Sequence, residues 1–104
     1  MTNVTDSVDK DIVALIERTV RETMGPFGLR GVEVRAGADH DGDPVIFVEA
    51  QYDLSERPID PRLTAKLTSR LTTTLRDRLW ERGETRFPHV RHKFDERQKV
   101  VGDR

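Results

Sequence analysis

Basic side chains at helical spacing are the residues of this chain whose types and positions point most directly to a chemical role. They fall on one side of a helix that is predicted to begin at Asp60-Pro61 and to end near Arg82, with Asp77 as the only acid among them. The side chains on this face are Arg62, Lys66, Ser69, Arg70, Thr73, Arg76 and Trp80. Cations with hydroxyls and one aromatic ring can bind phosphate groups or an acidic protein surface. A charged face that contacts only water has the same composition, so three interpretations stay open.

Alternating acids between two predicted strands resemble the start of an EF-hand calcium loop. Asp39, Asp41 and Asp43 have the required spacing. Pro44 stands where that loop needs Gly, however, and Ala50 stands where it needs the bidentate Glu. We therefore expect a solvated hairpin turn here rather than a metal site.

The histidines and the absence of cysteine limit the other kinds of site. His89 and His92 are three residues apart on a predicted strand, which places their rings on opposite faces of the sheet. We expect His92 at the boundary between sheet and helices, and His89 on the exposed face. The chain has 104 residues and no Cys, which excludes thiolate metal sites and a cysteine nucleophile. No serine lies in a nucleophile motif and no phosphate-binding loop motif occurs, so we expect no catalytic residue, no metal and no cofactor.

The segment Gly25-Pro26-Phe27-Gly28 has the G-x-x-G spacing with which KH domains hold a nucleic-acid backbone. It lies between a helix and a strand, and it carries no Lys or Arg. We interpret it as a helix stop, in which Gly25 takes the left-handed cap conformation and Pro26 cannot continue the helix.

Hydrophobic periodicity predicts the elements that position these residues, in the order α-β-β-α-β. A helical stripe runs from Val8 to Met24, and we expect Asp6 or Ser7 to cap this helix. Alternation of apolar and polar residues predicts strands at 31–38, 45–54 and 87–94. The second helix, 61–82, should pack its leucines against the sheet. These are Leu63, Leu67, Leu71, Leu75 and Leu79.

Two helices can cover one face of a small sheet and leave the other face polar and open. We therefore predict an α+β fold, a two-layer α-β-β-α-β sandwich in which a three-stranded sheet has both helices on one face, as in small ferredoxin-like or KH-like sheets. A single domain should span 8–94, with a flexible N-terminus at 1–7 and a charged C-terminal tail at 95–104.

From Val8 to Phe94, the order of elements resembles that of the cytoplasmic domains of cation-diffusion metal transporters, and more distantly that of KH domains. The Val-His-Asp motif on a strand of the transporter domain has no counterpart in 29–34. The resemblance therefore implies a fold and no function.

Charge is unevenly distributed along the chain. Residues 1–56 carry 5 Lys and Arg against 12 Asp and Glu, and residues 57–104 carry 13 against 7, so a net charge of −1 hides halves of −7 and +6. Such a chain can neutralise itself on folding, bind an oppositely charged partner or pair with a copy of itself.

Two apolar residues on the outer side of the second predicted strand suggest self-association. Val45 and Phe47 lie on the side that alternation turns toward water. A second subunit is the simplest cover for them, so we expect a homodimer with this face as the contact. The leading expectation is a small cytoplasmic, non-catalytic accessory protein that binds an acidic protein through its basic helix face or its open sheet face.

The alternative is an RNA- or DNA-binding module that uses the basic helix face, with Arg91 and Lys93 as extensions. The sequence pI of 6.3 is low for such a module. We expect no membrane partner, because no apolar run approaches the roughly 20 residues of a membrane span. Trp80 points away from the leucine stripe, and we expect the segment 84–87 or a partner subunit to cover it, ahead of a stacked base.

Overall fold

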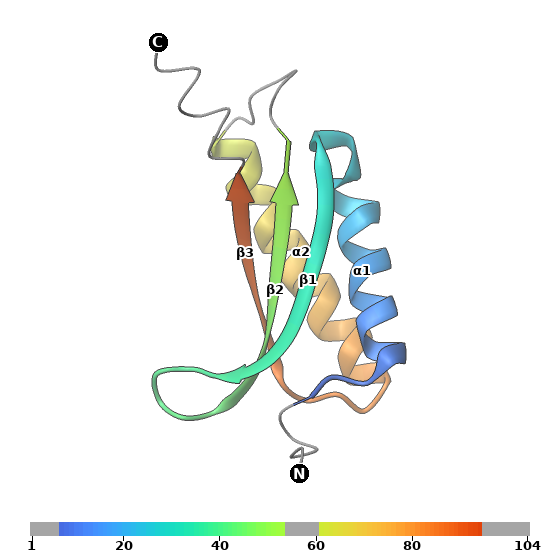
Figure 1. Cartoon of the computed structure of the whole chain (residues 1–104), viewed down its shortest axis with the longest axis vertical. Helices are drawn as coiled ribbons and strands as arrows, with labels where there is room; N and C mark the ends of the chain where they lie inside the picture. The colour runs from blue at the N-terminus through green and yellow to red at the C-terminus, as the bar shows by residue number, and fades with distance from the viewer. Residues whose placement is uncertain (1–6, 54–60, 95–104) are drawn as a thin grey trace.

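A three-stranded sheet with both helices on one side forms the architecture of the chain (Figure 1). The computed structural model describes residues 7–53 and 61–94. Asp60, at the expected start of the second helix, lies outside them, as do the first six residues of the expected flexible N-terminus and the expected tail 95–104. The elements are α1 (Lys10–Met24), the short 3-10 helix η2 (Gly25–Phe27), β1 (Leu29–Ala38), β2 (Pro44–Tyr52), α2 (Pro61–Glu81) and β3 (Phe87–Phe94).

The strand β2 lies in the middle of a mixed sheet with the order β1-β2-β3. β1 and β2 are antiparallel, whereas β2 and β3 are parallel and are joined through α2, which crosses behind the sheet (Figure 1). A parallel pair requires such a crossover connection. The predicted α+β fold, with two helices on one face of a three-stranded sheet, is confirmed. We call the face that points away from the helices the outer face.

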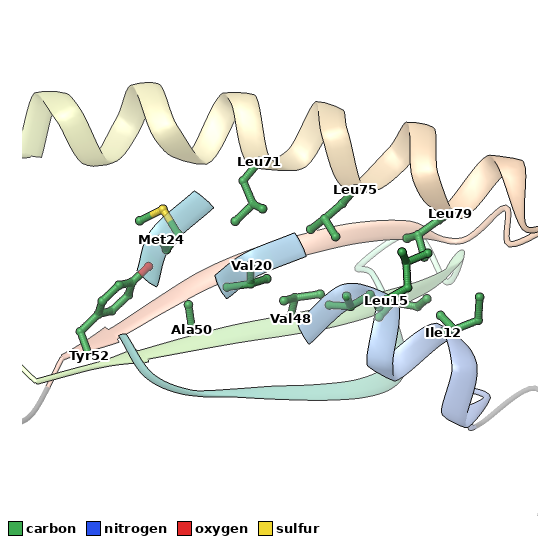
Figure 2. Close-up of a cluster of buried hydrophobic side chains, with 12 residues drawn as sticks. Ile12, Leu15, Val20, Met24, Val48, Ala50, Tyr52, Leu71, Leu75 and Leu79 are labelled. Atoms are coloured by element: carbon green, nitrogen blue, oxygen red, sulfur yellow. The ribbon is translucent and has the colours of Figure 1, made fainter. Parts of the chain in front are cut away.

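The hydrophobic core lies between the inner face of the sheet and the two helices (Figure 2). Its buried side chains are Ile12, Leu15, Ile16, Val20 and Met24 of α1, Ile46, Val48, Ala50 and Tyr52 of β2, and Leu71, Leu75 and Leu79 of α2. Every second residue of β2 therefore points at the helices, as the alternation predicts. The central strand supplies the sheet's most deeply buried side chains because both of its neighbours shield it.

The leucine stripe of α2 is only partly in the core. Leu63 is 38% exposed, so the expectation that it packs on the sheet is wrong. Leucines four residues apart drift by about 40° per step, because a helical turn takes 3.6 residues. Leu63 is three steps before the buried Leu75, which turns it by about 120° from the centre of the buried side.

The turn after α1 contains a left-handed glycine, but this residue is Gly28 and not the predicted Gly25. α1 does end at Met24, but Gly25 keeps right-handed helical dihedrals and begins η2. Gly28 has a φ of 84°, and a Cβ atom there would lie 2.6 Å from the carbonyl oxygen of Asp53. The amide of Asp53 donates to the carbonyl oxygen of Gly28 at 2.9 Å. Glycine is therefore required at position 28, where the chain enters β1.

Three element boundaries also differ from the sequence expectations. Asp9, rather than Asp6 or Ser7, occupies the N-cap position of α1, and it makes no side-chain cap hydrogen bond. β1 begins at Leu29 and is irregular between Leu29 and Gly31, while β2 already ends at Tyr52. Ends of elements depend on contacts that a local pattern does not contain.

The helix α2 ends at a glycine, as predicted. Gly83 has a φ of 81°, and its amide donates to the carbonyl of Trp80 while the amide of Glu84 donates to that of Leu79. This pair of bonds is a Schellman motif, which requires a left-handed residue. No helix in 7–53 or 61–94 is both long and apolar enough to cross a membrane.

Candidate binding surfaces

The exposed side of α2 carries the cations and the tryptophan that the sequence places together. Arg62, Lys66, Ser69, Arg70, Thr73, Arg76 and Trp80 are all exposed, and we call them the basic face. Apart from Arg70, they follow one another at steps of four and three residues, which keeps them on one side of the helix over about 27 Å. No acid occurs in the chain between Arg62 and Arg76. The structure therefore keeps this predicted grouping together.

Trp80 lies uncovered at the C-terminal end of the basic face. Its side chain is 69% exposed, so the expectation that the segment 84–87 folds back over it is wrong. The Schellman motif at Gly83 turns the chain toward β3 and away from the indole ring. Arg86 then fixes the new direction, because its guanidinium donates to both carboxylate oxygens of Glu84, at 2.8 and 2.9 Å, and to the carbonyl of Ser7. The side-chain hydrogen bond from Arg86 also lowers the pKa of Glu84.

One arginine of α2 has a structural role and does not belong to the basic face. Nη1 of Arg78 donates to Oε1 of Glu22 at 2.8 Å and to Oγ1 of Thr19 at 2.9 Å. Thr19 is fully buried, and its own hydroxyl donates to the carbonyl of Leu15. Arg78 therefore ties α2 to α1 and satisfies a buried hydroxyl between them.

The outer face of the sheet is built from rows that take one side chain from each strand. In register order the rows are Gly37, Val45 and Phe87; Arg35, Phe47 and His89; Glu33, Glu49 and Arg91; and Gly31, Gln51 and Lys93. Val45 is only 2% exposed, so the expectation that it lies uncovered on this face is wrong. It is a short side chain between the larger Phe47 and Phe87, whereas Phe47 itself is partly exposed.

Phe47 is the centre of a group of cations and rings on the outer face. The guanidinium carbons of Arg35 and Arg91 lie 5.3 and 5.9 Å from the centroid of its ring. The ring of His89 lies 5.9 Å away, centroid to centroid. A Cβ atom at Gly37 would be 2.4 Å from Cε2 of Phe47, so the ring leans over this glycine. Strands β1, β2 and β3 all contribute to this group.

An open pocket of about 130 Å³ lies beside the ring. Its lining residues are Glu33, Arg35, Phe47, Glu49 and Arg91. The two glutamates stand directly opposite each other in the register of β1 and β2. The side-chain amide of Gln51 donates to both of them, at 3.1 and 3.2 Å. The pocket thus combines two carboxylates with two guanidinium groups around one aromatic ring.

Arg91 and Lys93 do not extend the basic face. Both belong to the outer face, whereas α2 packs on the inner face, so the sheet separates them from Lys66 and Arg70. Arg76 joins the two surfaces, since its guanidinium carbon lies 5.3 Å from the centroid of the Phe87 ring. The molecule therefore has two candidate binding surfaces, which face different sides and meet at Arg76 and Phe87.

His92 lies between the sheet and α2, and His89 lies on the outer face, as their spacing predicts. Nδ1 of His92 is 2.7 Å from the hydroxyl of Tyr52, and Nε2 is 2.6 Å from Oγ1 of Thr68. Burial lowers the pKa of His92 and raises that of Tyr52. Both ring nitrogens are therefore engaged inside the fold. The described residues contain no group of three or more metal-binding side chains.

Arg35, Glu33 and Glu49 were not among the residues singled out from the sequence. The alternation of apolar and polar residues on β1 and β2 places all three on the outer face, and this pattern could have identified them as surface residues. Their closeness to Phe47 and Arg91 depends on the register of three strands, and no local pattern contains that information.

Comparison with known proteins gave no match: no protein-family model matches the chain, and no curated protein or solved structure is significantly similar to it. Its two surfaces are therefore the basis for assigning a function.

Proposed function

We propose that this protein is a cytoplasmic, non-catalytic binding protein that holds an acidic helical segment of another protein along its basic face. The observation that carries this proposal is Trp80, which is 69% exposed at the end of a row of cations and hydroxyls that contains no acid from Arg62 to Arg76. An exposed indole beside arginines is the composition of an interface hot spot, because Trp and Arg supply much of the binding energy at protein interfaces.

The spacing of the basic face supports a helical partner. Arg62, Ser69 and Arg76 are seven residues apart, and so are Lys66, Thr73 and Trp80. A seven-residue repeat follows a second helix that packs alongside, because it averages 3.5 residues per turn. A partner helix of about 18 residues would match the roughly 27 Å of this row. Acidic residues at the same repeat would meet the cations in turn.

Charge favours an acidic protein over a nucleic acid. The cations of the sheet, Arg91 and Lys93, lie on the other side of the molecule and cannot add phosphate contacts to the basic face. Asp77 and Glu81 are exposed near Trp80, so the partner needs an uncharged stretch at this end of the basic face. A helix can place apolar residues there, whereas every nucleotide of a nucleic acid carries a phosphate.

Fluorescence of Trp80 tests the proposal, because it is the only tryptophan. The probe is a synthetic amphipathic helix with Glu and Leu at heptad spacing, compared with the same peptide carrying Gln in place of Glu. We expect the acidic peptide to shift the emission to the blue and to bind more weakly as salt rises. The Gln peptide should bind at least about tenfold more weakly.

A paired variant, Lys66→Glu/Arg70→Glu, identifies the surface. It should abolish binding of the acidic peptide, while Arg35→Glu/Arg91→Glu, with the same change in charge on the outer face, should leave it unchanged. A single-stranded oligonucleotide is titrated in parallel. Tighter binding of the oligonucleotide than of the acidic peptide would replace this proposal by the nucleic-acid-binding alternative, and loss of binding in the outer-face variant would place the site elsewhere.

A further inference from the structure

We propose that the outer face of the sheet is the contact between two copies of this chain, related by a two-fold axis that lies between the two faces and runs parallel to β2. This inference is independent of the basic face, which lies on a different side of the molecule. The partner is a second copy because the cations and carboxylates of the outer face are complementary to those of the same face after a half-turn.

The outer face holds two cations that have no acidic partner in the part of the chain that the structure describes. Among residues 7–53 and 61–94, neither Arg35 nor Arg91 has a carboxylate within 4 Å. Both guanidinium groups lie against the ring of Phe47 instead, at 5.3 and 5.9 Å from its centroid. Contact with the ring leaves the N–H donors at the guanidinium edges available for a carboxylate.

The same face holds carboxylates that stand next to each other. Glu33 and Glu49 are paired across β1 and β2, and like charges in directly opposite positions destabilise a sheet. Only the amide of Gln51 donates a hydrogen bond to them among the described side chains. A cation brought over this pair by a second subunit would relieve the repulsion.

A two-fold axis parallel to β2 brings the two sets of charges together. It places β1 of one copy over β3 of the other and β2 over β2. The reason is that a half-turn about an axis between the two faces, parallel to the central strand, exchanges the edge strands. Glu33 in the third row then faces Arg91 of the second copy, and the symmetry makes this contact twice. The two contacts lie on either side of the Glu49 side chains, which meet on the axis between the two Arg91 guanidinium groups. Phe47 lies on the axis and meets Phe47 of the second copy, which covers the part of its ring that the monomer leaves exposed.

The size of the face sets the expected strength of the dimer. Three strands of about eight residues give a flat area of roughly 15 by 26 Å, or about 400 Å² per subunit. The total of about 800 Å² is below the roughly 1,200 Å² of stable specific interfaces and in the range of weak, transient contacts, so we expect a reversible dimer that dissociates in the micromolar range or above. The pairing of two outer faces would produce a β-sandwich with the helices on both outsides.

Charge exchange between positions 33 and 91 tests the inference, with sedimentation equilibrium from low micromolar to submillimolar concentration as the measurement. We expect Glu33→Arg and Arg91→Glu each to raise the dimer dissociation constant at least about tenfold, because each change acts at two symmetric contacts. The chain that carries both changes has its charges exchanged across the interface. It should dimerise again, within about threefold of the wild type.

The controls separate this inference from the proposed function. Lys66→Glu/Arg70→Glu should dimerise as the wild type does, even where it no longer binds the acidic peptide. Circular dichroism establishes that each variant is folded, and recovery in the double variant excludes misfolding as the cause of the single losses. A wild type that stays monomeric at submillimolar concentration would overturn the inference. So would a double variant that dimerises no better than Arg91→Glu alone.

Discussion

Nδ1 of His92 and the hydroxyl of Tyr52 lie 2.7 Å apart across β2 and β3, and the hydrogen bonds of Thr68 favour one tautomer of the ring in this contact. The hydroxyl of Thr68 donates to the carbonyl of Thr64, which can only accept. Oγ1 of Thr68 therefore accepts from Nε2–H of His92 at 2.6 Å. In the neutral imidazole Nδ1 then carries no proton, so it accepts the proton of the Tyr52 hydroxyl.

The free energy of unfolding should decrease as the pH falls below about 6.5, because His92 is harder to protonate in the folded protein than in the unfolded chain. Burial lowers its pKa, whereas in the unfolded chain the imidazole takes up a proton near pH 6.5. The unfolded state thus binds more protons below this pH, so the free energy of unfolding falls as the pH decreases from about 6.5 toward the pKa of the folded state. Above about pH 7.5 this group should have no effect.

Urea unfolding between pH 8 and pH 5 measures this dependence, and an NMR titration of the His92 ring reports its pKa directly. The variant His92→Gln should lose this part of the pH dependence. A His92 ring that titrates at or above its ordinary pKa would contradict the prediction.

Two leucines of the same stripe should differ strongly in their effect on stability. Leu71 is fully buried, so Leu71→Ala leaves a cavity and should lower the free energy of unfolding by about 2–5 kcal/mol. Leu63 is 38% exposed, and Leu63→Ala should change it by less than about 0.5 kcal/mol. Chemical denaturation of both variants is the measurement, and equal losses would show that α2 packs differently.

Two left-handed glycines provide a second matched pair. Gly42 has a φ of 88° with open space around a would-be Cβ atom, so Gly42→Ala should cost about 1–2 kcal/mol of backbone strain alone. At Gly28 the same strain is joined by a 2.6 Å approach to the carbonyl oxygen of Asp53. Gly28→Ala should therefore lower the melting temperature more than Gly42→Ala does, and the reverse order would refute the turn geometry.

Arg78 and Arg70 should separate stability from binding. Arg78→Met removes two hydrogen bonds between α2 and α1 and should cost about 1 kcal/mol of stability while leaving binding of the acidic peptide intact. Arg70→Met removes an exposed cation of the basic face, so it should weaken peptide binding and change stability by less than about 0.5 kcal/mol. Thermal unfolding measures the stability of both variants, and Trp80 fluorescence measures their peptide binding. A loss of peptide binding in Arg78→Met would contradict the assignment of Arg78 to stability and Arg70 to binding.

Which side of each element is buried could be predicted from the sequence. The stripe that contains Ile16 and Val20, and the alternation from Ile46 to Tyr52, are local periodicities that repeat at 3.6 and 2 residues. They identify the inward side of a helix or strand whatever its neighbours are. The helix stop at Gly83 could be predicted for the same reason, because a left-handed glycine acts within its own turn.

Only the tertiary structure decided which outward residues share a surface. Lys66 and Arg91 both point outward in the sequence pattern, yet they lie on opposite sides of the sheet, and Val45 points outward yet is buried. Arg35 comes to Phe47 through strand register. Periodicity fixes the angle of a side chain about the axis of its own element. The position of that axis among the others depends on contacts between residues far apart in the sequence, which local spacing does not contain.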